Sequence, residues 1–190
     1  VGHVQYPNRI LREAGLLTVS DEGDGERIDF ARSRGWALVD HQFSHVFVSD
    51  PTDLETVAAL FRGREGIAET LVGPERAKYR LTHERSGEII LVSTPDSWQA
   101  YYYWLDDARA PAFARTVDIH QKPGYDPVEM DFDATTRGIP LDAGLTRGSH
   151  GAPAVDRSQQ TVLLSSRPDL LRQPTYRDID VAELVLWHLP

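Results

Sequence analysis

Residues 36–51, WALVDHQFSHVFVSDP, contain two short apolar segments joined by polar residues. Trp36 to Val39 and His45 to Val48 are rich in the β-branched and aromatic residues that favour strands. DHQFS, at positions 40–44, lies between these strands or within them. The apolar EIILV at 88–92 predicts a further strand. We therefore expect a sheet to form around this part of the chain.

Helical periodicity surrounds these strands. NRILREAGLL, at 8–17, repeats its apolar residues at helical spacing, and LETVAALFRG predicts a helix to about Arg62 that Thr52 or Asp53 caps. The other expected elements are a loop or hairpin tip at 20–29, strands at 66–72 and 160–165, a short helix opened by Pro74, long ordered loops at 110–146, and a final helix, VAELVLWHL, capped by Asp178 or Asp180. Together they predict an α/β fold.

Composition narrows the class of protein. The chain has 190 residues, 41% of them hydrophobic, which suits one domain or one domain with a small appendage. A net charge of −9 argues against binding to nucleic acid or to an anionic membrane surface. The absence of cysteine excludes disulfides, thiolate metal sites and cysteine nucleophiles. No apolar run approaches the roughly 20 residues that span a membrane, so we expect a cytoplasmic protein.

GLTRGSHGAPA, at 144–154, carries the first candidate for chemistry. His150 lies between Ser149 and Gly151, with Gly148 just before them. Neutral imidazole is a common metal ligand and a general base, and flanking glycines allow a ligand to approach the backbone closely. The alternative is a histidine in an ordinary tight turn.

DIHQKPGYDPVEMDFD, at 118–133, carries the second. Asp118 and His120 would share one side of a strand, and Lys122 and Asp126 follow closely. Aspartate and histidine at this density suit a metal site with nitrogen and oxygen ligands. An ordered loop with aspartate side-chain turns is the alternative, because KPGYDP is dense in turn-forming residues.

A third candidate is Asp40 and His41, with His45 as a further nitrogen donor. Here the alternative is a hairpin with polar turn residues. The aromatic run WQAYYYW, at 98–104, could stack a ring but is more often part of a core or an interface. The sequence contains no glycine-rich phosphate loop and no G-x-S-x-G nucleophile motif.

The order of three motifs resembles a known family. NRILREAGLL, then THERSGEIILVS, then GLTRGSHGAPA is similar to the C-terminal half of alkaline phosphatase superfamily proteins of the type I phosphodiesterase/nucleotide pyrophosphatase group, to which phosphonoacetate hydrolase is related. HQKPGYDP is similar to a bacterial branch of that group. The resemblance covers most of the chain, although each motif is short.

The resemblance implies that His150 is one ligand of a site for two divalent metal ions, zinc or manganese. It implies that the threonine or serine nucleophile and the other ligands belong to an upstream half, because the chain has no Asp-His-Gly motif. Asp118, His120, Lys122 and Asp126 would then face the substrate or support the metal ligands. The expected substrate is a small phosphate ester.

The expected architecture is part of an alkaline-phosphatase-like core layer with a smaller α+β cap-like insertion. Residues 1–35 and 116–190 would belong to the core and residues 36–115 to the insertion. The chain starts Val-Gly-His-Val and has one methionine, so we expect the C-terminal fragment of a longer hydrolase, inactive alone.

Two further expectations follow. A truncated core would expose an apolar face, which favours a homo-oligomer. The alternative to a hydrolase is a non-catalytic α/β module that binds a ligand or partner, with residues 101–104 as its contact surface.

Overall fold

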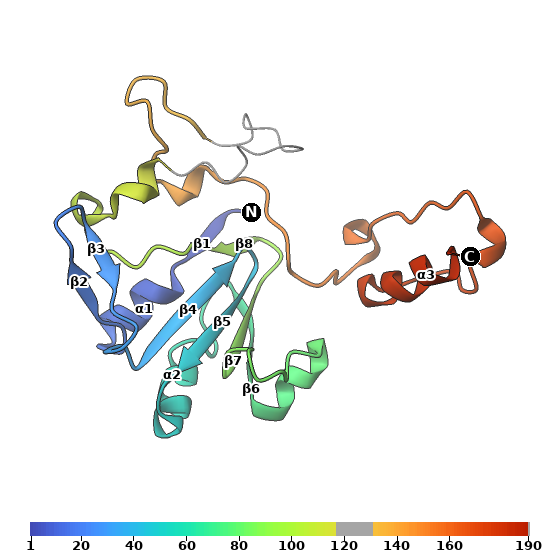
Figure 1. The fold of residues 1–190 in the computed structure, drawn as a ribbon, viewed down its shortest axis with the longest axis horizontal. Helices are drawn as coiled ribbons and strands as arrows, with labels where there is room; N and C mark the ends of the chain where they lie inside the picture. The colour runs from blue at the N-terminus through green and yellow to red at the C-terminus, as the bar shows by residue number, and fades with distance from the viewer. Residues whose placement is uncertain (117–130, 190) are drawn as a thin grey trace. The chain divides into compact units, whose positions relative to one another are not determined.

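The structure is a computed structural model that describes residues 1–116 and 131–189 (Figure 1). It has a mixed α/β fold with small parallel and antiparallel sheets, which confirms the α/β class. The chain divides into two compact units, Val1–Ala152 and Pro153–Pro190. The expected core layer and cap-like insertion, with boundaries near 35 and 115, stay predictions.

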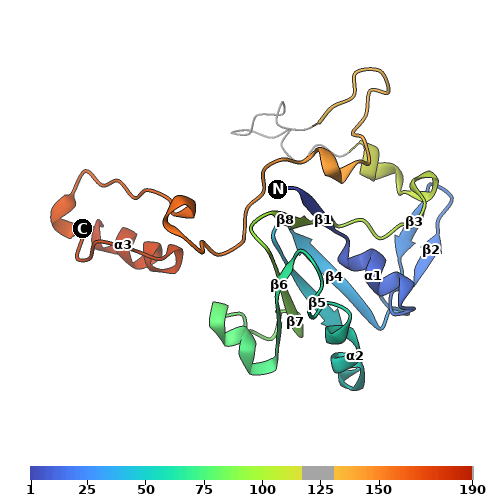
Figure 2. The same ribbon diagram turned by 180° about the vertical axis from the view of Figure 1, so that it is seen from behind.

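The largest sheet has four antiparallel strands in the order β4-β5-β7-β6 (Figure 2). Their bounds are Gly35–Asp40 for β4, Phe43–Val48 for β5, Ile67–Val72 for β6 and Ile89–Ser93 for β7. All four predicted strands in this part of the sequence are thereby confirmed. β4 and β6 form the two edges of the sheet.

Two smaller sheets flank it. β1 (His3–Gln5) pairs in parallel with β8 (Ser97–Gln99), and β2 (Val19–Asp21) pairs antiparallel with β3 (Glu26–Ile28). The β2–β3 pair confirms a hairpin at the polar, glycine-rich stretch near residue 24.

The helix α1 (Pro7–Glu13) ends earlier than the periodicity predicts. The backbone turns at Gly15, whose φ of 71° lies in the left-handed region that favours glycine. Leu16 and Leu17 therefore leave the helix, but both are buried in the core. The apolar spacing correctly identified buried residues and overestimated the length of the helix.

The helix α2 (Leu54–Ala59) follows a 3₁₀ turn, η1 (Pro51–Asp53). Asp53 stands at the N-cap position of α2, as predicted, but its side chain makes no capping hydrogen bond. Asp50 accepts a hydrogen bond from the Thr52 N–H at 2.8 Å, and the Asp53 carboxylate instead binds the guanidinium of Arg34. Hydrogen bonds between charged groups are stronger than those to a neutral N–H, so the Asp53 carboxylate binds Arg34 and does not cap the helix.

The remaining helical segments are short, with at most seven residues each. The 3₁₀ segments are η2 (Gly73–Tyr79), η3 (Asp107–Arg109), η4 (Ala112–Arg115), η6 (Ala143–Leu145), η7 (Arg157–Gln159), η8 (Pro168–Leu170) and η9 (Asp178–Asp180), and the helix α3 spans Val181–Trp187. η2 is the helix predicted at Pro74, and α3 is the predicted final helix. In the described ranges, no helix is long and apolar enough to cross a membrane.

Strand register places the core on one face of the four-stranded sheet. Ala37, Val46 and Ile89 are neighbours across β4, β5 and β7, and they pack in one cluster with Leu11 of α1 and Val57 of α2. On the other face, a smaller cluster joins Leu71, Ile90 and Val92 to Tyr79 and Leu81. The sheet is thus packed on both faces, which explains why every residue of β7 is buried.

The aromatic run at 101–104 belongs mainly to the core. Tyr102, Tyr103 and Trp104 are buried, and the Tyr102 and Trp104 rings stack with centroids 4.4 Å apart. Tyr101 is 42% exposed. Most of these rings therefore fill the interior and are not available to form the contact surface expected of a binding module.

A side-chain amide joins α1 to the edge of the sheet. Asn8 is buried; its Oδ1 accepts from the Ala37 N–H at 2.7 Å, and its Nδ2 donates to the Ala37 carbonyl at 2.9 Å. The amide thus occupies the position that a neighbouring strand would take on β4.

Replacement of Asn8 by alanine is expected to lower the free energy of unfolding by about 2 kcal/mol, since it leaves two buried backbone groups without their partners. Urea denaturation followed by circular dichroism measures the change. A midpoint equal to that of the wild type would contradict it.

The Pro153–Pro190 unit corrects one predicted strand. Residues 160–165 form no strand in the structure, and Val162 and Leu164 are 82% and 87% exposed. An extended segment becomes a strand only when another segment pairs with its backbone, and no described residue does so here. Asp180 stands at the N-cap position of α3, but its side chain makes no capping hydrogen bond to that helix. Its carboxylate instead accepts from the Arg177 N–H at 3.0 Å, at the start of η9.

Candidate functional site

Two of the three candidate histidine segments meet in the structure. The Gln42 N–H, in the turn between β4 and β5, donates a hydrogen bond to the His150 carbonyl at 2.9 Å. The rings of His41 and His150 lie with centroids 4.1 Å apart and planes tilted by 41°. The first and third candidates therefore form one site, although neither motif predicts the other.

The β4–β5 turn is tightly fixed. Asp40 and Phe43 pair across the hairpin, so His41 and Gln42 form a two-residue turn, and His41 has a φ of 55°. A positive φ in such a turn matches the right-handed twist of the two strands.

The Gln42 side chain anchors this turn from within. It is buried, and its Nε2 donates to the Ser97 carbonyl at 2.9 Å. The backbone adds two bonds, from the Ser93 N–H to the Gln42 carbonyl at 2.8 Å and from the Gln99 N–H to the His41 carbonyl at 2.7 Å. The turn is therefore held by the end of β7 and by β8.

Glycine is required at position 151 and not at position 148. Gly151 has a φ of 103°, and a Cβ there would lie 3.2 Å from the Phe43 Cδ1. A Cβ at Gly148 would meet only open space. Of the two glycines that flank His150, only Gly151 is therefore needed by the backbone of this loop.

His150 itself is exposed, while His41 is partly buried. The Ser149 Oγ is buried and has no hydrogen-bond partner within the described ranges. The loop thus turns its histidine outward and its serine inward.

His45, the further nitrogen of the third candidate, has a different environment. Its Nδ1 accepts a hydrogen bond from the Gly87 N–H at 3.1 Å, and burial lowers the pKa of its imidazole, with a smaller contribution from Arg76. Both effects favour a neutral ring. The second candidate, with Asp118, His120, Lys122 and Asp126, lies outside the described residues.

The described residues do not complete a metal site. No group of three or more histidine, aspartate or glutamate side chains that could hold a metal ion occurs in residues 1–116 and 131–189. Zinc in catalytic sites takes three protein ligands, and the pair of His41 and His150 falls short of that number.

A cleft of about 420 Å³ lies elsewhere in the Val1–Ala152 unit, bordered by two arginines and three aspartates, Arg115, Arg137, Asp107, Asp133 and Asp142. The three carboxylates already accept hydrogen bonds from neighbouring groups. The two guanidiniums could contact an anionic group there, as arginine does with phosphate and carboxylate.

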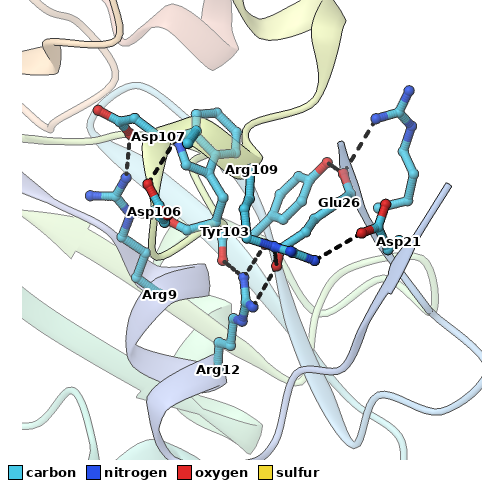
Figure 3. Close-up of polar contacts among 11 residues, drawn as sticks. Arg9, Arg12, Asp21, Glu26, Tyr103, Asp106, Asp107 and Arg109 are labelled. Atoms are coloured by element: carbon cyan, nitrogen blue, oxygen red, sulfur yellow. Dashed lines mark hydrogen bonds and ion pairs between the residues drawn. The ribbon is translucent and has the colours of Figure 1, made fainter. Parts of the chain in front are cut away.

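Sequence reasoning missed an ion-pair network around the buried carboxylate of Glu26 (Figure 3). The carboxylate of Glu26, on β3, lies 2.5 and 3.0 Å from the two terminal nitrogens of Arg12 and 2.8 Å from the Arg109 Nε. Arg109 also contacts Asp21, and the Tyr103 hydroxyl donates to the Glu26 carbonyl. The network joins α1, the β2–β3 hairpin and η3. Nothing in the sequence distinguishes its charged members from ordinary surface residues.

Comparisons with protein-family models, with curated proteins and with solved structures found no match to this chain.

Proposed function

We propose that this chain is part of a metal-dependent phosphoric-ester hydrolase of the phosphodiesterase/nucleotide pyrophosphatase type, with His150 as one metal ligand. The GSHG motif and its resemblance to that family motivate the assignment. The observation that carries it is the presentation of His150: an exposed imidazole on a loop whose backbone is fixed at Gln42 and whose next residue must be glycine.

Such a hydrolase uses two metal ions roughly 4 Å apart to polarise the phosphoryl group and to activate the nucleophile. His150 would contribute one nitrogen. The remaining ligands and the nucleophile would come from residues outside the described ranges or from an upstream part of the same protein.

The proposed substrate is a small phosphate ester, and the proposed metal ions are zinc or manganese. In this proposal, Asp118, His120, Lys122 and Asp126 face the substrate or support the ligands. Lys122 would act on the phosphate as a point charge. The finer architecture proposed with this function is an alkaline-phosphatase-like core layer that carries a cap-like insertion.

The exposed apolar side chains of the Pro153–Pro190 unit support the accompanying proposal that the chain self-associates. Val162, Leu164, Leu186 and Leu189 are among them. A non-catalytic binding module is the weaker reading, because the aromatic surface expected for it is mainly buried.

The test is hydrolysis of bis(p-nitrophenyl) phosphate with added zinc or manganese. We expect no turnover by the 190-residue chain alone and turnover by the complete gene product. His150→Ala should lower that turnover at least about 100-fold, the upper end of the loss seen when a residue supporting a metal ligand is removed.

His83→Ala is the matched control, because His83 is an exposed histidine whose Nδ1 accepts only a local bond from the Arg85 N–H. It should retain wild-type turnover. Activity of the 190-residue chain that survives His150→Ala, or a complete gene product that hydrolyses no phosphate ester, would overturn the proposal.

A further inference from the structure

We propose that His45 is a pH-sensitive anchor for the 73–87 segment, which consists of η2 and the chain that leads from it to β7. The neutral ring accepts a hydrogen bond at Nδ1 from the Gly87 N–H, at 3.1 Å. A protonated imidazole carries a hydrogen on both nitrogens and accepts no hydrogen bond. Acid therefore removes the acceptor from Gly87 and weakens the attachment of the segment to the sheet.

The Gly87 backbone lies directly against β5. Gly87 is buried, and a Cβ on it would lie 2.7 Å from the Val46 carbonyl oxygen and 2.8 Å from the Val46 nitrogen. Such close packing leaves the Gly87 N–H little access to water while the segment stays in place. A buried N–H that loses its acceptor is destabilising, so protonation of His45 favours a shift of Gly87 away from the sheet.

The surroundings of His45 oppose its protonation. Its direct neighbours across the sheet are apolar, Leu38 on β4 and Ile90 on β7. Burial lowers the pKa of the imidazole, the Arg76 guanidinium lowers it further, and Asp40 on β4 raises it by less. The attached segment therefore favours the neutral ring, which is the form that accepts the hydrogen bond.

Two further contacts hold the same end of the segment. Arg76 donates from Nη1 to the Gly87 carbonyl at 2.7 Å, so the guanidinium that opposes protonation of His45 also binds the residue that His45 anchors. The Glu88 carboxylate accepts from the Val48 N–H at 2.9 Å. Of the three contacts, the one at His45 is made by an imidazole, whose charge changes closest to neutral pH.

The 73–87 segment covers part of the outer face of the sheet. Tyr79 and Leu81 pack on the smaller apolar cluster of Leu71, Ile90 and Val92. Detachment of the end of the segment from β5 loosens this cover. Mild acid is therefore expected to expose apolar surface that stays buried at neutral pH.

The pH range follows from the two states of His45. In the detached state the imidazole titrates near its ordinary pKa of about 6.5, and in the attached state its pKa is lower. The attachment is therefore strongest above about pH 6.5 and weakens as the pH falls from there through the lower pKa of the attached state. One pH unit below 6.5, the detached state gains up to about tenfold over the attached state.

Hydrogen exchange of the Gly87 amide in the 190-residue chain measures this effect. Protection factors are compared at about pH 7.5 and about pH 5.5, and each is divided by that of a β7 amide to remove changes in global stability. In the wild type, the protection of Gly87 should fall about 3–10-fold over this range.

His45→Asn is the decisive variant, because an amide oxygen can replace Nδ1 as the acceptor and does not titrate. Its Gly87 protection should be the same at both pH values. His83→Asn is the matched control, since His83 is an exposed histidine of the same segment whose Nδ1 also accepts a backbone N–H, that of Arg85. It should retain the pH dependence of the wild type.

Gly87 protection that does not change with pH in the wild type would overturn the proposal. An equal fall in His45→Asn would do the same, because another group would then be titrating. NMR titration of the His45 ring nitrogens in the wild type covers the case in which His45→Asn does not fold. A neutral ring protonated at Nε2, with a pKa below about 6.5, is expected.

A ring protonated at Nδ1, or a His45 pKa at or above the ordinary value, would equally reject the anchor. None of these measurements involves a metal ion or a substrate, so their outcome is independent of the proposed hydrolase function.

Discussion

Replacement of Trp104 by alanine is expected to lower the free energy of unfolding by about 3–5 kcal/mol, the range for removal of a large aromatic side chain from a core. Trp104 is fully buried and stacks on Tyr102. Its indole N–H donates to the Asp107 Oδ1 at 2.9 Å, so the ring also holds the start of η3. Thermal and urea denaturation measure the loss.

Two further variants separate the contributions of the Trp104 hydrogen bond and of a neighbouring ring to the free energy of unfolding. Trp104→Phe keeps an aromatic ring and removes the bond to Asp107, and should cost about 1–2 kcal/mol. Tyr101→Ala removes a neighbouring ring that is substantially exposed, and should cost less than Trp104→Ala. Equal losses at positions 101 and 104 would show that the run does not pack as described.

Replacement of Glu26 by alanine is expected to lower the free energy of unfolding by about 3 kcal/mol, the lower end of the range for breaking a buried ion pair. The Glu26 side chain is almost fully buried, and its loss leaves Arg12 without its bidentate carboxylate. The lower end applies because Arg109, the other partner, is half exposed and can be hydrated.

The exposed pair of Glu55 and Arg62 provides the matched control. It has a similar bidentate geometry, with both side chains on the surface. Glu55→Ala should therefore cost at most about 1 kcal/mol. A loss at Glu26 no larger than that at Glu55 would contradict the structural role of the buried network.

The Glu26 contribution should also depend on pH. Hydrogen bonds from Arg12 hold the pKa of Glu26 below its ordinary value and outweigh burial, which acts in the opposite direction. The stabilisation is therefore complete above the pKa of an unfolded glutamate, about 4.3, and is lost as the pH falls through the lower folded value. The stability difference between wild type and Glu26→Gln should shrink as the pH falls below about 4.

Sequence predicted the sheet well because its strands are strongly apolar and bounded by turn residues. EIILV is the clearest case, since every residue of β7 is buried. QTVLLS, the strand predicted at 160–165, has a similar local pattern but forms no strand in the structure. Local pattern reports apolar content and backbone preference, while strand formation also requires a pairing partner that no local window contains.

The candidate site was predicted in parts and not as a whole. Glycine at 151 marked the loop, and Asp40-His41 marked the hairpin, but each pattern is local. Their meeting depends on the Gln42 N–H reaching the His150 carbonyl, a contact between residues more than 100 positions apart in the chain. The same limit applies to Asp53. Its carboxylate binds the guanidinium of Arg34 and makes no capping hydrogen bond at the start of α2, which no local pattern predicts.

The amide of Asn8 has a consequence for how this protein behaves at high concentration. An edge strand offers unpaired backbone groups to any strand from another molecule, which is a common start of aggregation. On β4, the Asn8 amide occupies both groups of Ala37, and the Leu16 carbonyl accepts from the Gly35 N–H. An incoming strand would have to displace these bonds before it could extend the sheet. The buried amide of Asn8, together with the Leu16 carbonyl, is thus expected to hinder strand addition along this edge.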